Sequence, residues 1–223
     1  MFVLYNILKM GEMMIEEIEL KISGTKEEIE KHLLNQGFSV FFKRRTIANY
    51  YLPPNEEIGE HKTLKSRCVR LRTSFKIDEE IRKLGFRKLD LSESQDEEKL
   101  SLKEAKKLEK QLLKDGYQLI HTDDKTDFVY ILKEKDLAFQ IQDIEGLGII
   151  VAYDNKDYYN LPSKKQREKL IKDVEHYGIK IQDYNQVDRF AGIDKSKKFS
   201  IKEIVKVCKN HNATHQSENV LNN

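Results

Sequence analysis

Apolar and charged residues alternate along the stretch from 17 to 22. The charged members are Glu17, Glu19 and Lys21, and the apolar members are Ile18, Leu20 and Ile22. A period of two is typical of a β-strand with one buried face and does not fit a helix. Charges on one strand face need water, a metal or a charged ligand, because burying them unpaired costs too much free energy. The alternative to a binding site is a solvated outer face of a sheet.

Three other stretches predict amphipathic helices that are marked at both ends. Each begins with Ser or Thr three residues before Glu or Gln, the pattern of a capping box, and each ends at a glycine. The start pairs and their end glycines are Thr25 and Glu28 with Gly37, Ser101 and Glu104 with Gly116, and Ser163 and Gln166 with Gly178.

The remaining apolar runs predict strands separated by polar turns. They cover residues 38–42, 47–52, 64–75, 86–91, 117–120, 127–132, 137–144 and 149–153. Residues 92–99 are expected to form an acidic loop. The pattern predicts a folded domain over 15–195, an N-terminal extension over 1–14, and a basic, Asn-rich tail over 196–223 that is partly disordered.

The two halves of the predicted domain resemble each other. The stretch 33–38 is similar to 112–117, with Gly116 lying 79 positions after Gly37, and the same offset aligns 49–51 with 128–130. A strand–helix–strand unit used twice predicts one α+β domain with a pseudo-two-fold repeat.

Composition narrows the class of protein. The chain has 223 residues, enough for one substantial core, and a net charge of only +2 that gives no global basic field for nucleic acid. Two cysteines, Cys68 and Cys208, are too few for a disulfide framework and fit a reducing cytoplasm. No apolar run approaches the roughly 18 to 20 residues of a membrane span, and the first residues lack the features of a secretory signal. The oligomeric state stays open.

A second charged strand is expected around Arg70 and Arg72. If these arginines share one face of a curved sheet with Glu17, Glu19 and Lys21, the sheet carries acids beside bases. Closing such a sheet into a barrel gives a charged channel. Nearby carboxylates suit Mg²⁺ or Mn²⁺, and Arg and Lys suit phosphate oxygens. The combination predicts a metal-bound polyphosphate as the ligand.

The order of these motifs resembles that of the CYTH, or triphosphate tunnel metalloenzyme, superfamily. That superfamily includes class IV adenylate cyclases, thiamine triphosphatases and tripolyphosphatases on an antiparallel β-barrel tunnel. The matching motifs are E-x-E-x-K at 17–21, R-x-R at 70–72, K-x-x-x-x-Y at 125–130 and a stretch at 143–148 similar to D-x-x-x-G-L-G. The resemblance spans roughly residues 15–195.

The resemblance implies a role for each matching residue. Glu17 and Glu19 would hold Mg²⁺ or Mn²⁺, with Asp143 and Asp154 as further candidate ligands. Lys21, Arg70, Arg72 and Lys125 would bind triphosphate oxygens, and the first three would also serve catalysis. The reaction would be attack on a triphosphate by water or by a ribose 3′ hydroxyl, which depends mostly on positioning and charge neutralisation.

Several positions depart from the family pattern. Asp127 and Ala152 replace an expected arginine and an expected glutamate, and the acid before the G-L-G turn falls on Gln142, with Asp143 one place late. Lys88 and Glu93 are only weak matches to the remaining motifs. Three hypotheses follow. The first is a metal-dependent triphosphatase or cyclase-like enzyme, and the second is a protein that binds nucleotide or polyphosphate without turnover. The third is a scaffold with solvated charged strands.

Overall fold

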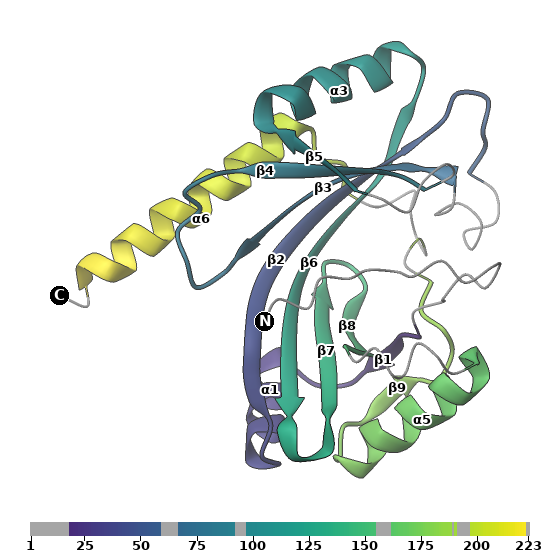
Figure 1. The fold of residues 1–223 in the computed structure, drawn as a ribbon, viewed down its shortest axis with the longest axis vertical. Helices are drawn as coiled ribbons and strands as arrows, with labels where there is room; N and C mark the ends of the chain where they lie inside the picture. The colour runs from purple at the N-terminus through teal and green to yellow at the C-terminus, as the bar shows by residue number, and fades with distance from the viewer. Residues whose placement is uncertain are drawn as a thin grey trace.

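The computed structural model describes residues 18–58, 67–91, 97–154, 162–188, 190 and 197–221, with side chains described as far as residue 214. One antiparallel sheet of nine strands runs through this part of the chain (Figure 1). The strands are β1 Leu20–Ile22, β2 Ser39–Leu52, β3 Val69–Lys76, β4 Gly85–Asp90, β5 Glu98–Ser101, β6 Gln118–Leu132, β7 Leu137–Ile144, β8 Gly148–Tyr153 and β9 Ile181–Asp183. The helices are α1 Lys26–Asn35, α3 Leu102–Lys114, α5 Ser163–His176 and α6 Ile201–Leu221, with a 3₁₀ turn η2 at Lys133–Lys135.

The strand order confirms the predicted repeat. Along the sheet the strands follow as β5-β4-β3-β2-β6-β7-β8-β1-β9. A two-fold axis between β2 and β6 exchanges β1 with β5, β3 with β7 and β4 with β8, and it leaves only β9 without a counterpart among the strands described. Gly37 and Gly116, which end the two equivalent helices, both have φ +88. The two halves therefore exchange their first strands, since β1 pairs with β8 and β5 pairs with β4.

The α+β fold class predicted from the sequence is confirmed, with an antiparallel sheet and flanking helices. β2 and β6 run the length of the molecule and carry the curvature of the sheet from one half to the other (Figure 1). Within the described residues the hydrogen-bonded order ends at β5 and β9, which do not pair with each other.

The helix ends lie where the capping signals place them. Thr25 and Ser101 each accept a hydrogen bond from the backbone N–H of the glutamate three residues later, and that glutamate accepts one in return. α5 begins at Ser163 as predicted, but Pro162 occupies its N-cap and no side chain caps it. Local hydrogen bonds thus fix the first two helices independently of the rest of the fold.

Two pairs of predicted strands merge into single long ones. The runs 38–42 and 47–52 become β2, and the runs 117–120 and 127–132 become β6. The basic residues between the first pair do not break the strand because each finds a carboxylate: Lys43 pairs with Glu30 at 2.8 Å, and Arg45 binds Asp124 through Nε and Nη2 at 2.8 and 2.6 Å.

One expectation is wrong at its end, because residues 98 and 99 of the acidic loop expected over 92–99 belong to strand β5. The tail over 196–223, expected to be partly disordered, contains helix α6. Ile201, Ile204 and Cys208 are buried at helical spacing, and Ser200 exchanges hydrogen bonds with Glu203 in a further helix cap. The N-terminal extension over 1–14 lies outside the described residues.

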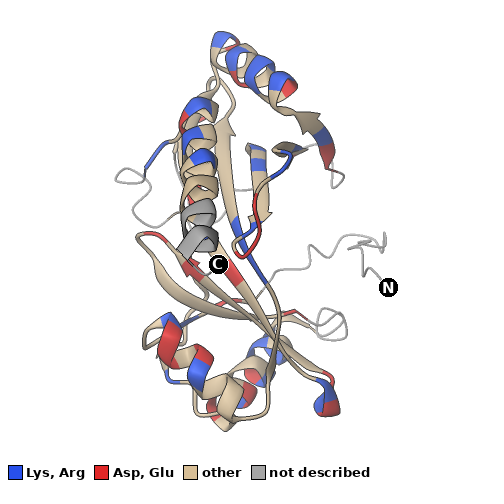
Figure 2. Ribbon diagram, turned by 90° about the vertical axis from the view of Figure 1, so that its left-hand side faces the viewer, with Lys and Arg blue, Asp and Glu red and all other residues tan. Residues whose placement is uncertain are grey.

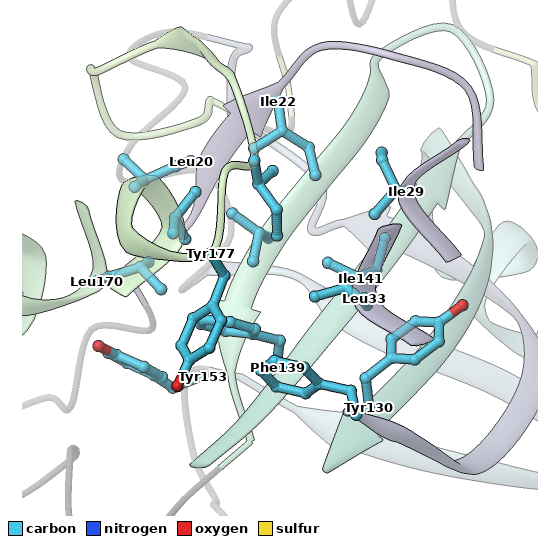
Figure 3. Close-up of a cluster of buried hydrophobic side chains, with 14 of the residues drawn as sticks. Leu20, Ile22, Ile29, Leu33, Tyr130, Phe139, Ile141, Tyr153, Leu170 and Tyr177 are labelled. Carbon is cyan, nitrogen blue, oxygen red and sulfur yellow. The ribbon is translucent and has the colours of Figure 1, made fainter. Parts of the chain in front are cut away.

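Helices cover one face of the sheet. In the half formed by β6, β7, β8 and β1, the aromatic and aliphatic side chains of this face pack against α1 and α5 (Figure 3). In the half formed by β2, β3 and β4, they pack against α3 and α6. Figure 2 shows lysines and acids, in blue and red, along α3, at the top, and along the part of α6 above its grey end. This face holds the apolar core of the molecule.

Both cysteines are free thiols and are buried. Burial raises the pKa of Cys68 to about 12 and that of Cys208 to about 11, so neither is a reactive thiolate. Among the described helices, none is both long enough and apolar enough to cross a membrane.

Candidate functional site

The strand register gathers the predicted cationic residues on the face that the helices leave uncovered. Directly opposed residues of antiparallel strands point to the same side of a sheet. One row across five strands consists of Lys21, Ile150, Gln142, Asp127 and Arg44. A second row consists of Arg87, Arg72, Ala48 and Asp123.

Because side chains alternate along a strand, residues two positions from a member of either row lie on the same side of the sheet, and these are Glu19, Arg70 and Lys125. We call the side of the sheet that carries both rows and these three residues the charged face. Most of it is withdrawn from solvent: the exposed fractions of Glu19, Asp127 and Gln142 are 4%, 0% and 1%. The arginines of the charged face are more exposed, with 20% for the side chain of Arg70 and 26% for that of Arg72. The tunnel prediction requires a partly enclosed face lined by charged groups, and this face has that character.

The chain that follows β9 crosses part of the charged face. The side-chain oxygen of Gln186 accepts a hydrogen bond from the backbone N–H of Glu19 at 3.2 Å. Phe190 packs edge-on against Tyr50, with ring centroids 5.3 Å apart, and also contacts His121. These contacts close off the end of the charged face nearest Tyr50 with apolar side chains.

Arg70 and Arg72 converge on Glu97, the residue before β5. One oxygen of Glu97 lies 3.0 Å from Arg70 Nη2 and 2.7 Å from Arg72 Nε. The other lies 2.8 Å from Arg72 Nη2 and 3.2 Å from Arg87 Nη1. Burial opposes the ionisation of Glu97, but hydrogen bonds and charge from Arg72, together with the charge of Arg70, outweigh it and lower the pKa of Glu97. Three guanidinium groups therefore share one carboxylate.

Lys125 and Arg44 are held by Asp127, the residue that replaces the expected arginine. Asp127 lies 3.2 Å from Lys125 Nζ and 2.9 Å from Arg44 Nε, and it accepts a hydrogen bond from Gln140 at 3.1 Å. Burial opposes ionisation of Asp127, but the charges of Lys125 and Arg44 outweigh it, so the pKa of Asp127 is lowered. Lys125 is on the predicted face, but it already has an anionic partner.

Lys21 differs from the other cations of the charged face. It is half-buried, and none of the residues that the structure describes forms an ion pair with it. Its chain end lies against Gly148, whose φ is +97, so that a Cβ at this glycine would come within 3.4 Å of Lys21 Cε. The last glycine of the G-L-G turn thus leaves room for the lysine as well as making the turn.

The acidic candidates separate into two groups. Asp154 directly follows β8, and its backbone N–H donates a hydrogen bond to the carbonyl oxygen of Ala138 at 2.9 Å, so the pairing with β7 continues to this residue. Asp154 therefore lies on the same side of the sheet as Ala152, in a position diagonal to Glu19 on the neighbouring strand. Asp143 lies opposite Thr126 and Ile149, on the other face, and is exposed. The sheet does not bring Asp143 together with Glu19.

The carboxylates that the structure describes do not complete a metal site by themselves. Glu17 lies outside the described residues, and within them no three His, Cys, Asp or Glu side chains form a group that could hold a metal ion. Glu19 and Asp154 are both oxygen donors of the kind that Mg²⁺ and Mn²⁺ prefer, and diagonal neighbours across a sheet lie roughly 7–8 Å apart. Their chemistry fits a divalent cation.

Sequence reasoning missed three residues of the charged face: Arg44, Arg87 and Glu97. Arg44 stands in a basic run, and only its register opposite Asp127 distinguishes it from its neighbours. Glu97 stands in an acidic run whose members look equivalent. The weak matches Lys88 and Glu93 find no support, since Lys88 points to the helix-covered face with Leu71 and Glu93 lies outside the described residues.

Comparisons with known proteins bear on the fold. No protein-family model matches the sequence, and no curated protein matches it. The PH1819 protein from Pyrococcus horikoshii OT3 is similar in structure, with a TM-score of 0.50 and 18% identity over 79% of this chain and 96% of that chain. The PH1012 protein from the same organism gives a TM-score of 0.46 and 14% identity over 82% and 100%. A proposed adenylate cyclase from Vibrio parahaemolyticus gives a TM-score of 0.49 and 15% identity over 81% of this chain and 98% of that chain. The likeness to PH1819 extends over nearly all of that protein, and it supports the antiparallel α+β fold.

Proposed function

We propose that the charged face binds a triphosphate-containing ligand, such as a nucleotide or an inorganic polyphosphate. The observation that carries the proposal is the gathering of Lys21, Arg70 and Arg72 on one withdrawn face of a sheet whose other face is apolar. Lysine and arginine provide several donors for phosphate oxygens, and arginine can bind two at once. The motif order that resembles the CYTH superfamily supports the same ligand class.

A divalent cation is part of this proposal. Glu19 and Asp154 would hold Mg²⁺ or Mn²⁺, which when bound would neutralise charge on the phosphates. The chain itself would orient the triphosphate through Lys21 and the arginines and would exclude water from the buried part of the face. Asp143 is left out, because its strand position directs it to the opposite side of the sheet.

Replacing Lys21 by methionine is expected to weaken tripolyphosphate binding at least about tenfold, because a charge-assisted hydrogen bond to phosphate is lost. The measurement is thermal unfolding with Mn²⁺ and increasing tripolyphosphate or ATP, since binding to the folded state raises Tm. Lys31→Met is the matched control: it makes the same change of charge on the exposed side of α1. Absence of any ligand-dependent shift in the unaltered chain would refute the proposal, and equal losses in both variants would reduce it to a bulk charge effect.

Conversion of the bound triphosphate is the finer part of the proposal. On this basis the chain is a phosphohydrolase or a class IV cyclase-like enzyme, and Asp154→Asn is expected to remove the response of product formation to Mn²⁺. The assay measures phosphate release and cyclic nucleotide, with Asp143→Asn as the control on the other face. If Asp143→Asn is the variant that loses the response, the assignment of the acids is wrong.

The second candidate is binding without turnover. Asp127 favours it, because a buried carboxylate in place of the expected arginine withdraws Lys125 and Arg44 from the ligand. The two candidates share the binding experiment and differ in one result. Ligand-dependent stabilisation without product, with Mn²⁺ present, selects the binder.

A further inference from the structure

Three arginines from two strands surround a single internal carboxylate. Arg72 and Arg87 stand directly opposite each other on β3 and β4, and like charges in that position repel. Glu97 lies between them and also contacts Arg70, so that its two oxygens are in contact with three guanidinium groups. Among the residues that the structure describes, these four side chains carry three positive charges and one negative charge.

This arrangement suits a phosphoryl group better than it suits a carboxylate. A terminal phosphoryl group offers three oxygens and close to two negative charges, whereas Glu97 offers two oxygens and one charge. Contacts of 2.7 to 3.2 Å show that the arginines are already at hydrogen-bonding distance from an anion. The positions of the guanidinium groups therefore require no large rearrangement to receive phosphate.

Glu97 differs from Asp127 in how firmly the fold holds it. Asp127 is in the middle of β6 and its side chain has no exposed surface. Glu97 precedes β5, lies outside the strand ladder, and retains 15% exposure of its side chain. A carboxylate at the end of an edge strand can move aside at a lower cost than one fixed within a central strand.

We propose that Arg70, Arg72 and Arg87 form one phosphate-binding triad and that Glu97 occupies it in the absence of ligand, so that an incoming phosphoryl group must displace this carboxylate. The inference rests on the proposed function and adds to it a third arginine and an internal competitor. Glu97 then lowers the affinity for every ligand that uses the triad, and it excludes anions too weak to displace it.

The test compares Glu97→Gln with Glu98→Gln. Both remove one negative charge from adjacent positions, but Glu98 lies on the opposite side of β5, 4.0 Å from Lys88 and with 63% side-chain exposure. Titration calorimetry with tripolyphosphate is expected to show about tenfold tighter binding for Glu97→Gln. The reason is that the ligand no longer has to displace a carboxylate from the three arginines before it binds. Glu98→Gln is expected to bind as the unaltered chain does.

Arg87→Gln gives an independent readout. Arg87 is half-exposed, so the variant is expected to fold, and loss of one guanidinium contact should weaken tripolyphosphate binding about tenfold. Arg82→Gln, an exposed arginine between β3 and β4, is the control and should bind unchanged.

The outcomes separate the inference from the proposed function. Weaker or unchanged binding by Glu97→Gln, in a chain that otherwise binds tripolyphosphate, would make Glu97 a positioning residue for the arginines and overturn the inference alone. Equal tightening by Glu98→Gln would show a general charge effect and overturn it as well. If neither the unaltered chain nor any variant binds tripolyphosphate, the proposed function fails and the inference fails with it.

Discussion

Replacing Asp127 by asparagine is expected to lower the free energy of unfolding by about 3 kcal/mol, because it leaves Lys125 and Arg44 without their buried counter-charge. The value lies at the low end for broken buried ion pairs, since the Arg44 side chain is 36% exposed and can turn toward water. The measurement is urea unfolding at neutral pH. Loss of the charge also leaves Lys125 available to a ligand.

Asp143→Asn is the matched control for stability. It makes the same change on β7, at an exposed position on the opposite face, and should alter the free energy of unfolding by less than about 0.5 kcal/mol. If the two variants are equally stable, Asp127 is not the anchor of the charged face. Tripolyphosphate binding in the same samples shows whether Lys125 becomes a ligand once it is released, which the family resemblance implies.

The contribution of Asp127 should also depend on pH in a defined direction. Its pKa in the folded chain is lowered from the ordinary value of 3.8, despite burial, by the charges of Lys125 and Arg44. A carboxyl group with a lower pKa in the folded state stabilises above its unfolded pKa, and this stabilisation is lost as pH falls through the folded pKa. The difference in stability between the unaltered chain and Asp127→Asn should therefore be full at pH 5 to 7 and shrink below about pH 4. A difference that stays constant to pH 2 would contradict the ion-pair explanation.

Local signals made the helices predictable, while the site depended on long-range pairing. Thr25 and Glu28 are three residues apart and form their cap without help from the rest of the fold. Arg44 and Asp127 are 83 residues apart and meet only because β2 and β6 pair in one register. The sequence showed a basic run and an unexpected acid, and it gave no indication that each neutralises the other.

The alternation of apolar and charged residues along a strand predicted which face of the sheet a side chain lies on, but it did not predict which residues that side chain contacts. The period of two placed Lys21 and Arg72 on charged strand faces, in agreement with the register. The register also places Asp143, one position after Gln142, on the other face. The alternation did not identify Glu97, because an acidic run holds several equivalent candidates. The pairing of β5 with β4 decides which of them reaches the arginines.

Replacing Phe139 by alanine is expected to lower the free energy of unfolding by about 4 kcal/mol, because a large side chain leaves a cavity in the core. Phe139 has no exposed surface and stacks on Phe38 and Tyr153, with ring centroids 5.6 and 6.0 Å away (Figure 3). Its ring also meets the edge of Tyr177, which follows α5. Equilibrium denaturation by urea measures the loss.

Phe41→Ala controls for the removal of the same ring, because Phe41 lies in β2 with 66% exposure and should change the free energy of unfolding by less than about 0.5 kcal/mol. The cluster around Phe139 also contains Leu20, the neighbour of both Glu19 and Lys21 on β1. A loosened core should therefore weaken tripolyphosphate binding in Phe139→Ala even where the protein remains folded. If Phe139→Ala is destabilised by the expected amount and binds the ligand as tightly as Phe41→Ala does, the packing of this core does not position the charged strand, and the rigidity of the site must come from its ion pairs.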